Sequence, residues 1–95
     1  MKIHELKIKP EYAYMVMVGV KRFELRKNDR DFQVGDLFHF VVTGKSNDDG
    51  LVTSWELAIE SYIYKITYVL KDVEEYGLDK DYCIFGFVKL VEENR

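Results

Sequence analysis

Large aromatic side chains crowd this short chain, which has seven Tyr and six Phe among its 95 residues. A chain of this length closes one hydrophobic core, because two cores would each fall near the small-domain limit of roughly 40 to 60 residues. Aromatic rings bring a large apolar area with few rotatable bonds, which suits a small barrel whose interior is filled by side chains. We therefore expect a single domain over residues 1–95, built around a small, curved β-sheet or barrel.

The first half of the chain predicts three strands and one helix. Apolar residues mixed with polar ones over 3–8 indicate a short strand. A helix is expected over about residues 10–18, because Pro10 suits a first helical position and apolar residues recur at helical spacing behind it. Alternation over 21–27 and an apolar run over 37–43 predict two further strands.

The second half is dominated by residues that favour strands. The polar segment 44–50 is expected to be a surface loop. The stretch 55–70 is rich in β-branched and aromatic residues and predicts one long bent strand or two. The run 82–91 predicts a strand buried on both faces, with Gly86 marking a bend or a close backbone approach. The fold class is thus α+β, a small barrel of five or six mostly antiparallel strands with one main helix.

The charge is small overall but unevenly distributed. The formal net charge of −3 argues against a protein that holds nucleic acid by bulk charge. Residues 19–30, however, contain five bases and two acids, so this segment carries +3 and the rest of the chain −6. We expect a basic face on an acidic body.

Composition also argues against several kinds of site. Cys83, the single cysteine, lies in an apolar run and indicates a buried small hydrophobe in a reducing compartment. His4 and His39 have no ligand-spaced partners, so we expect no metal, and no motif points to a cofactor. No apolar run approaches the roughly 20 residues of a membrane span, and the default expectation is a cytoplasmic protein without a membrane partner.

The segment Gly19-Val20-Lys21-Arg22-Phe23-Glu24-Leu25-Arg26 carries the most specific pattern. Strand alternation places Arg22, Glu24 and Arg26 on one face and predicts that Phe23 and Leu25 face the core. A carboxylate between two guanidiniums can hold a planar or anionic ligand, with Lys21 reaching over the same cleft. The alternative is a solvated strand face with weak ion pairs, each worth 0 to about 1 kcal/mol.

The same residues resemble a known family. Gly19-x-Lys21-x-x-Glu24-x-Arg26 resembles the G-x-K-x-x-E-x-R motif of ASCH domains, which are similar in fold to PUA domains. The flanking segments 4–8 and 26–36 resemble a small bacterial and phage ASCH-like family. The resemblance is close over about residues 3–44 and looser over 64–70 and 82–91, while 45–56 looks like local elaboration.

The resemblance implies a PUA-like β-barrel with a helix beside a cleft and a module that binds RNA or a nucleotide-like small molecule. On this interpretation Lys21, Arg26 and Arg30 would meet phosphate, and Glu24 would read a base edge or position Arg26. Exposed Tyr residues of the 62–68 run would stack on a base. The candidate ligand-binding residues are Lys21, Arg22, Glu24, Arg26, Lys27 and Arg30.

Two other functions stay open at this point. One branch of ASCH-like proteins is similar to an amidohydrolase of modified nucleosides that uses the motif lysine with a threonine and a glutamate. Here Glu24 stands in the place of that threonine, and Lys21 and Glu24 would be the catalytic candidates, with Thr43 and Thr67 as the remaining threonines in apolar strands. We expect binding rather than catalysis. The third possibility is a protein-interaction domain that uses the acidic remainder of the chain, including Asn47-Asp48-Asp49.

Overall fold

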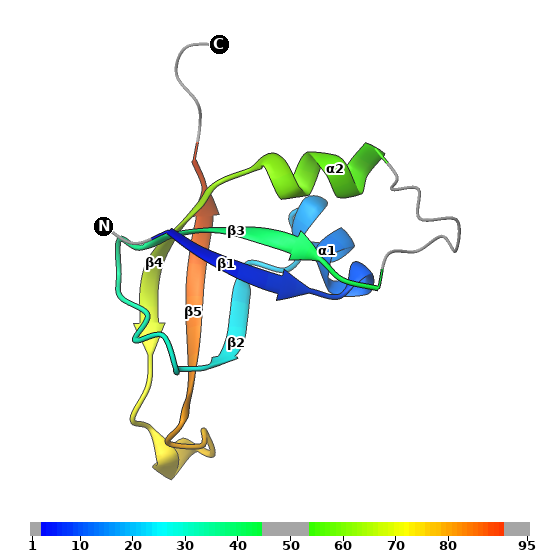
Figure 1. Cartoon of the computed structure of the whole chain (residues 1–95). Coiled ribbons are helices and arrows are strands. Elements are labelled where there is room, and N and C mark those ends of the chain that lie inside the picture. The colour runs from blue at the N-terminus through cyan, green and yellow to red at the C-terminus, as the bar shows by residue number, and fades with distance from the viewer. Residues whose placement is uncertain (1–2, 45–53, 91–95) are drawn as a thin grey trace.

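The computed structural model describes residues 3–44 and 54–90, with side chains described from Glu56 onward in the second part. Figure 1 shows how the elements follow one another along the chain. They are β1 (Ile3–Ile8), α1 (Pro10–Met17), β2 (Phe23–Lys27), β3 (Leu37–Val42), α2 (Ser54–Ser61), β4 (Tyr64–Leu70), the 3-10 helix η1 (Glu74–Tyr76) and β5 (Tyr82–Lys89).

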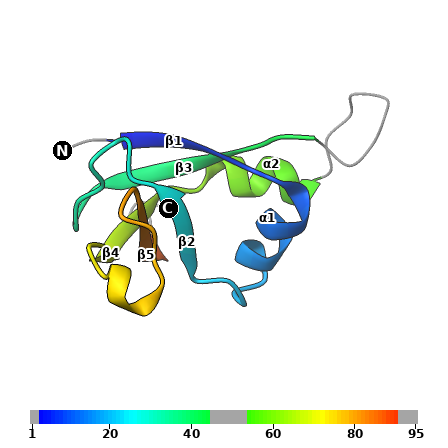
Figure 2. The same ribbon diagram turned by 90° about the horizontal axis from the view of Figure 1, so that it is seen from below.

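The described strands form one mixed sheet in the order β1-β3-β4-β5-β2. The β1–β3 pair is parallel, and the other three pairs are antiparallel. The sheet curls into a half-barrel with β1 and β2 as its two edge strands (Figure 2). The predicted α+β class with a small, mostly antiparallel barrel is confirmed at this level.

Helices α1 and α2 pack against each other, and α2 also packs on β3 (Figure 1). The Glu60 carboxylate on α2 accepts a 2.8 Å hydrogen bond from the backbone N–H of Val42 at the end of β3. Helix α1 follows β1 directly, with Pro10 at its first turn and Glu11 near its positive end, as these residue types favour. The path from β1 through α1 brings the chain back to the opposite edge of the half-barrel, where β2 begins.

Aromatic rings fill the half-barrel. Phe38 lies at the centre, with ring centroids of Phe40, Tyr64, Phe85 and Phe87 between 5.2 and 5.4 Å from its own. Most of these contacts are edge-to-face, the arrangement that ring quadrupoles favour. The side chains predicted to fill a small barrel therefore do so, although several other aromatic residues stay on the surface.

A register irregularity lies beside Gly86, which was expected to mark a bend or a close backbone approach. The partner strand β4 has a register irregularity between Ile66 and Tyr68, directly opposite Phe87 and Gly86. This is the position at which a bulge increases twist and lets a short strand pair turn toward closure. The sequence prediction that β5 is buried on both faces is wrong, because Cys83, Phe85 and Phe87 are buried while the alternate residues are partly or largely exposed.

The segment 55–70, predicted as one long bent strand or two strands, is in fact a helix and a strand, α2 and β4. The helix places Glu56, Ile59 and Glu60 at helical spacing, and Glu56 and Ile59 are fully buried while Leu57 is 55% exposed. The expectation of a single main helix is therefore also wrong. The predicted loop over 44–50 lies almost entirely outside the described residues.

A pair of truncations separates the helix from the strand interpretation. In a strand Leu57 and Ile59 would share a face, whereas in α2 only Ile59 points into the core. We expect Ile59→Ala to lower the free energy of unfolding by about 2 to 5 kcal/mol. Leu57→Ala should stay within about 0.5 kcal/mol of the wild type in urea unfolding. Equal losses for both variants would contradict the helix.

Candidate functional site

A tight turn after α1 delivers the motif to the edge of the sheet. Gly19 has φ +84°, a left-handed conformation that side chains with a Cβ adopt rarely. The turn lets the backbone N–H groups of Val20 and Lys21 both donate to the carbonyl of Met15 at 3.0 Å. The glycine of the motif is thus required by the turn that ends the helix, and it sets where Lys21 enters the site.

Glu24 is the centre of the motif and is only 4% exposed. Its Oε2 pairs with Lys21 Nζ, and its Oε1 accepts from Arg26 Nε at 3.0 Å. Lys21 Nζ also donates to the carbonyl of Phe23 at 2.6 Å. A buried carboxylate is costly without cations and donors around it, and here both oxygens have them. The predicted grouping of Lys21, Glu24 and Arg26 is present.

The face on which this group lies is the reverse of the prediction. Phe23 and Leu25 are 50% and 55% exposed, so they do not face the core, and Glu24 points inward instead. The reason is that β2 is an edge strand of a half-barrel with the seam to β1 beside it. The inward position at this edge is filled by the ionic group, and the apolar side chains of β2 remain on the outer surface.

Arginine side chains connect the two edge strands across this seam. Arg26 Nη2 donates to the carbonyl of Lys7 at 2.7 Å, and Arg30 Nη1 donates to the carbonyl of Glu5 at 2.6 Å. Both carbonyls belong to β1, whose other edge pairs with β3. An unpaired strand edge is a liability, and guanidinium groups here supply donors that a neighbouring strand would otherwise supply. Arg26 therefore holds Glu24 and β1 at once.

A groove of about 530 Å³ lies over the seam. One side is formed by the end of β1 and the start of α1, and the other by β2 and the start of β5. Its lining residues are Lys7, Ile8, Lys9, Tyr12, Lys21, Phe23, Glu24, Leu25, Arg26, Lys27 and Tyr82. Five of these side chains are basic, and the one acid, Glu24, is already paired with two of them. The groove is therefore basic and carries three partly exposed aromatic rings.

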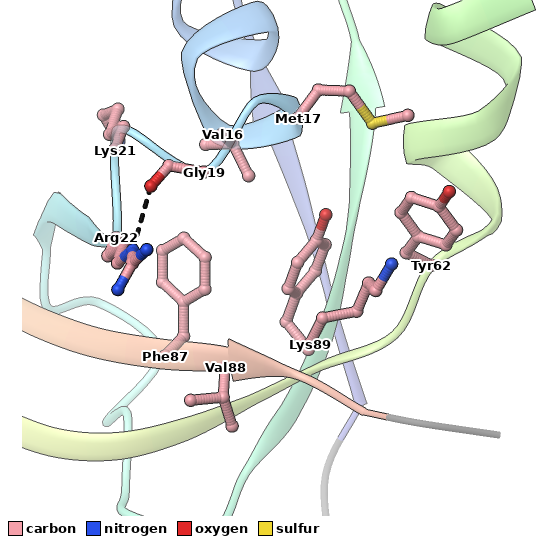
Figure 3. A pocket seen from close by; sticks show the side chains of 10 residues that line it. Val16, Met17, Gly19, Lys21, Arg22, Tyr62, Phe87, Val88 and Lys89 are labelled. Atoms are coloured by element: carbon pink, nitrogen blue, oxygen red, sulfur yellow. Dashed lines mark hydrogen bonds between the residues drawn. The ribbon is translucent and has the colours of Figure 1, made fainter. Parts of the chain in front are cut away.

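A second, smaller pocket of about 300 Å³ lies on the other side of Lys21 (Figure 3). It is bounded by Val16 and Met17 of α1, by Tyr62, and by Phe87 and Lys89 of β5. Lys89 Nζ lies 4.0 Å from the centroid of the Tyr62 ring, a cation–π contact inside the pocket itself.

Two further polar groups of this second pocket are affected by their surroundings, one through a hydrogen bond and the other through burial. Arg22 Nε donates to the carbonyl of Gly19 at 2.9 Å, as the dashed line in Figure 3 shows. Burial, with a smaller contribution from Tyr62, raises the pKa of Tyr64 to about 12. Tyr64 is therefore a neutral hydroxyl at any physiological pH.

Four of the six predicted site residues meet in the groove, namely Lys21, Glu24, Arg26 and Lys27. Arg22 lies in the second pocket, and Arg30 lies farther along the seam on Glu5. Lys7, Lys9, Tyr12 and Tyr82 were missed. Lys7 and Lys9 alternate with buried Ile8, which indicates that they are exposed. The seam itself is made by Arg26 and Arg30 side chains that contact β1 carbonyls, and no local pattern predicts those contacts.

The other residues singled out from sequence have structural surroundings. Cys83 is fully buried, and this burial raises the pKa of its thiol. His4 is buried, with Nε2 2.9 Å from Asp36 Oδ2. The Thr43 hydroxyl lies 3.3 Å from the carbonyl of Ile8, and neither Thr43 nor Thr67 lines the groove or the second pocket.

Within residues 3–44 and 54–90 no group of three or more His, Cys, Asp or Glu side chains is placed to hold a metal ion. In this described part of the chain, no helix has the length and apolar character that crossing a membrane requires.

Comparison with known proteins places this chain in a family. Residues 3–87 match the model described as "Domain of unknown function (DUF3850)", and the chain belongs to this family. It is also similar to the "Uncharacterized 12.9 kDa protein in GpA 3'region" of Escherichia phage P2, with 49% identity over 35 residues. That match covers 37% of this chain and about a third, 32%, of the phage protein's length.

Removing the charge of Glu24 tests the ionic group at the seam. In Glu24→Gln, Lys21 and Arg26 stay partly buried without a compensating carboxylate, so we expect the free energy of unfolding to fall by about 3 kcal/mol. Glu5→Gln is the matched control, because that carboxylate is exposed and the Glu5 carbonyl still accepts from Arg30. Urea unfolding measures both, and a Glu24→Gln loss as small as that of the control would contradict the account.

Proposed function

We propose that this member of the DUF3850 family is a nucleic-acid-binding module that holds single-stranded RNA, or a nucleotide-like part of it, in the groove over the β1–β2 seam. The observation that carries the proposal is the combination of basic and aromatic side chains along one groove, on a chain whose net charge is −3. A polyanion with flat apolar bases is the ligand class that matches both features.

We assign phosphate binding to the groove lysines whose side chains are not paired with Glu24. Lys21 and Arg26 share their charge with Glu24, and Arg26 also contacts β1. Lys9 and Lys27 are exposed and lie on opposite sides of the groove. Lys9 and Lys27, with Lys7 beside them, are therefore the phosphate-binding candidates, and the motif residues shape the floor between them.

The bases are assigned to the aromatic rings of the groove. Tyr12 and Phe23 are about half exposed and Tyr82 more than a third, although all three rings are large and apolar. Base stacking on such rings contributes about 1–3 kcal/mol per base and tolerates different sequences. Both oxygens of Glu24 already accept hydrogen bonds, which favours a positioning role for Glu24 over the reading of a base edge.

The resemblance to ASCH domains supports the same location. The resemblance implies that the motif Gly19-x-Lys21-x-x-Glu24-x-Arg26 lines a cleft beside the first helix, and on this proposal the half-barrel would be a PUA-like fold. The resemblance carries an expectation of RNA-linked function, and the groove supplies a physical reason for it.

Exchange of single lysines tests the groove against the second pocket. We expect Lys27→Ala to weaken binding of a fluorescein-labelled oligouridylate several-fold in fluorescence anisotropy. The slope of log K against log salt should become shallower by about 0.7, because one phosphate contact is lost. Lys89→Ala removes the same charge from the second pocket and should leave affinity unchanged. Loss with Lys89→Ala and none with Lys27→Ala would move the site, and no binding by the wild type would end the proposal.

A further inference from the structure

The outer face of the sheet continues beyond the groove. Register places Phe23 of β2 opposite Gly86 of β5, and Gly86 opposite Tyr68 of β4. The three residues form one row across adjacent strands, and Tyr68 is 63% exposed. Neighbouring strands lie about 4.8 Å apart, so the backbones that carry the two rings are separated by roughly 10 Å. Gly86 leaves the space between them without a side chain.

A second row lies beside the first. Leu25 pairs with Ile84, and Ile84 with Leu70, on the same outer face. We call this surface the outer platform, and it consists of Phe23, Leu25, Tyr68, Leu70, Tyr82, Ile84 and Gly86. Phe23, Leu25 and Tyr82 also line the groove, so the outer platform and the groove share a border.

The charges on the outer platform favour a nucleic-acid strand over a second copy of this chain as its ligand. Of the charged residues in β2, β4 and β5, Lys27 and Lys65 alternate onto the outer face. Glu24 and Arg26 share the opposite face of β2 and pair with each other, and Lys89 belongs to the second pocket. A second copy of this chain would bring equal positive charges together across such a face, which costs free energy. A single strand of nucleic acid brings phosphates to the lysines and flat bases to the rings.

We propose that the outer platform is a second base-stacking subsite, continuous with the groove, so that the ligand is a single-stranded oligonucleotide rather than a mononucleotide. This rests on the proposed function of the groove. Bases leaving the groove past Phe23 lie over Gly86 and reach Tyr68, and Lys65 and Lys27 flank their path. Thr67, whose Oγ1 lies 3.5 Å from where a Cβ on Gly86 would stand, borders the same space.

The test is the dependence of affinity on ligand length. Uridine monophosphate and uridylates of two, four, six and eight nucleotides are titrated into the wild type, Tyr68→Ala and Tyr76→Ala. Tyr76 is a matched control, since it is a more exposed tyrosine on η1 and lies outside the outer platform and the groove. We expect wild-type affinity to rise up to at least four nucleotides. Tyr68→Ala should weaken binding of the longer oligomers by about 5- to 150-fold and leave the monophosphate unaffected.

The outcomes separate the two proposals. Tight binding that is equal at all lengths, or equal affinity of Tyr68→Ala and wild type for the longer oligomers, overturns the outer platform and leaves the groove standing. Absence of binding at every length overturns both. A concentration-dependent dimer in sedimentation that Tyr68→Ala abolishes, with no dependence on ligand length, assigns the face to a second copy and overturns the subsite. Deoxyuridylates of the same lengths show whether the ribose hydroxyl contributes.

Discussion

A carboxylate withdrawn from water needs cations and donors close by, and in this small half-barrel Glu24 obtains them from Lys21 and Arg26 of its own segment. The arrangement joins elements that backbone hydrogen bonds leave apart. Arg26 contacts β1 with the same guanidinium that holds Glu24, and Arg30 makes a parallel contact four residues later. The turn at Gly19 places Lys21 in this ionic group, and the groove lies over the seam that the group joins.

The roles of the motif residues therefore differ from those that the sequence pattern predicted. Residues at the heart of the motif support the site, and exposed residues around it are available to a ligand. Arg26 is occupied on two sides, whereas Lys9 and Lys27 stand at the rim of the groove.

Much of the fold follows from local pattern, and the departures have physical causes. Strands β1, β2, β3 and β5 and helix α1 lie close to the predicted ranges because alternation, Pro10 and Gly19 act locally. Helix α2 was missed because β-branched and aromatic residues from Tyr62 onward dominated the window, although Glu56, Ile59 and Glu60 have helical spacing. The face of β2 was assigned wrongly, because the sequence pattern shows which residues share a face and not which face is covered.

Prediction of the candidate site from sequence was limited in the same way, because local spacing is visible in a sequence and tertiary contacts are not. Grouping of Lys21, Glu24 and Arg26 follows from their spacing, but the contribution of Lys7, Lys9 and Tyr12 depends on β1 lying across the seam from β2, which is a tertiary relation. The most direct test of the whole account is a backbone-amide NMR titration of the wild type with a uridine tetranucleotide. Binding along the groove and the outer platform would shift the amide signals of residues 7–12, 21–27 and 82–86 and of Tyr68. Shifts centred on Met17, Tyr62 and Lys89, or none at all, would contradict it.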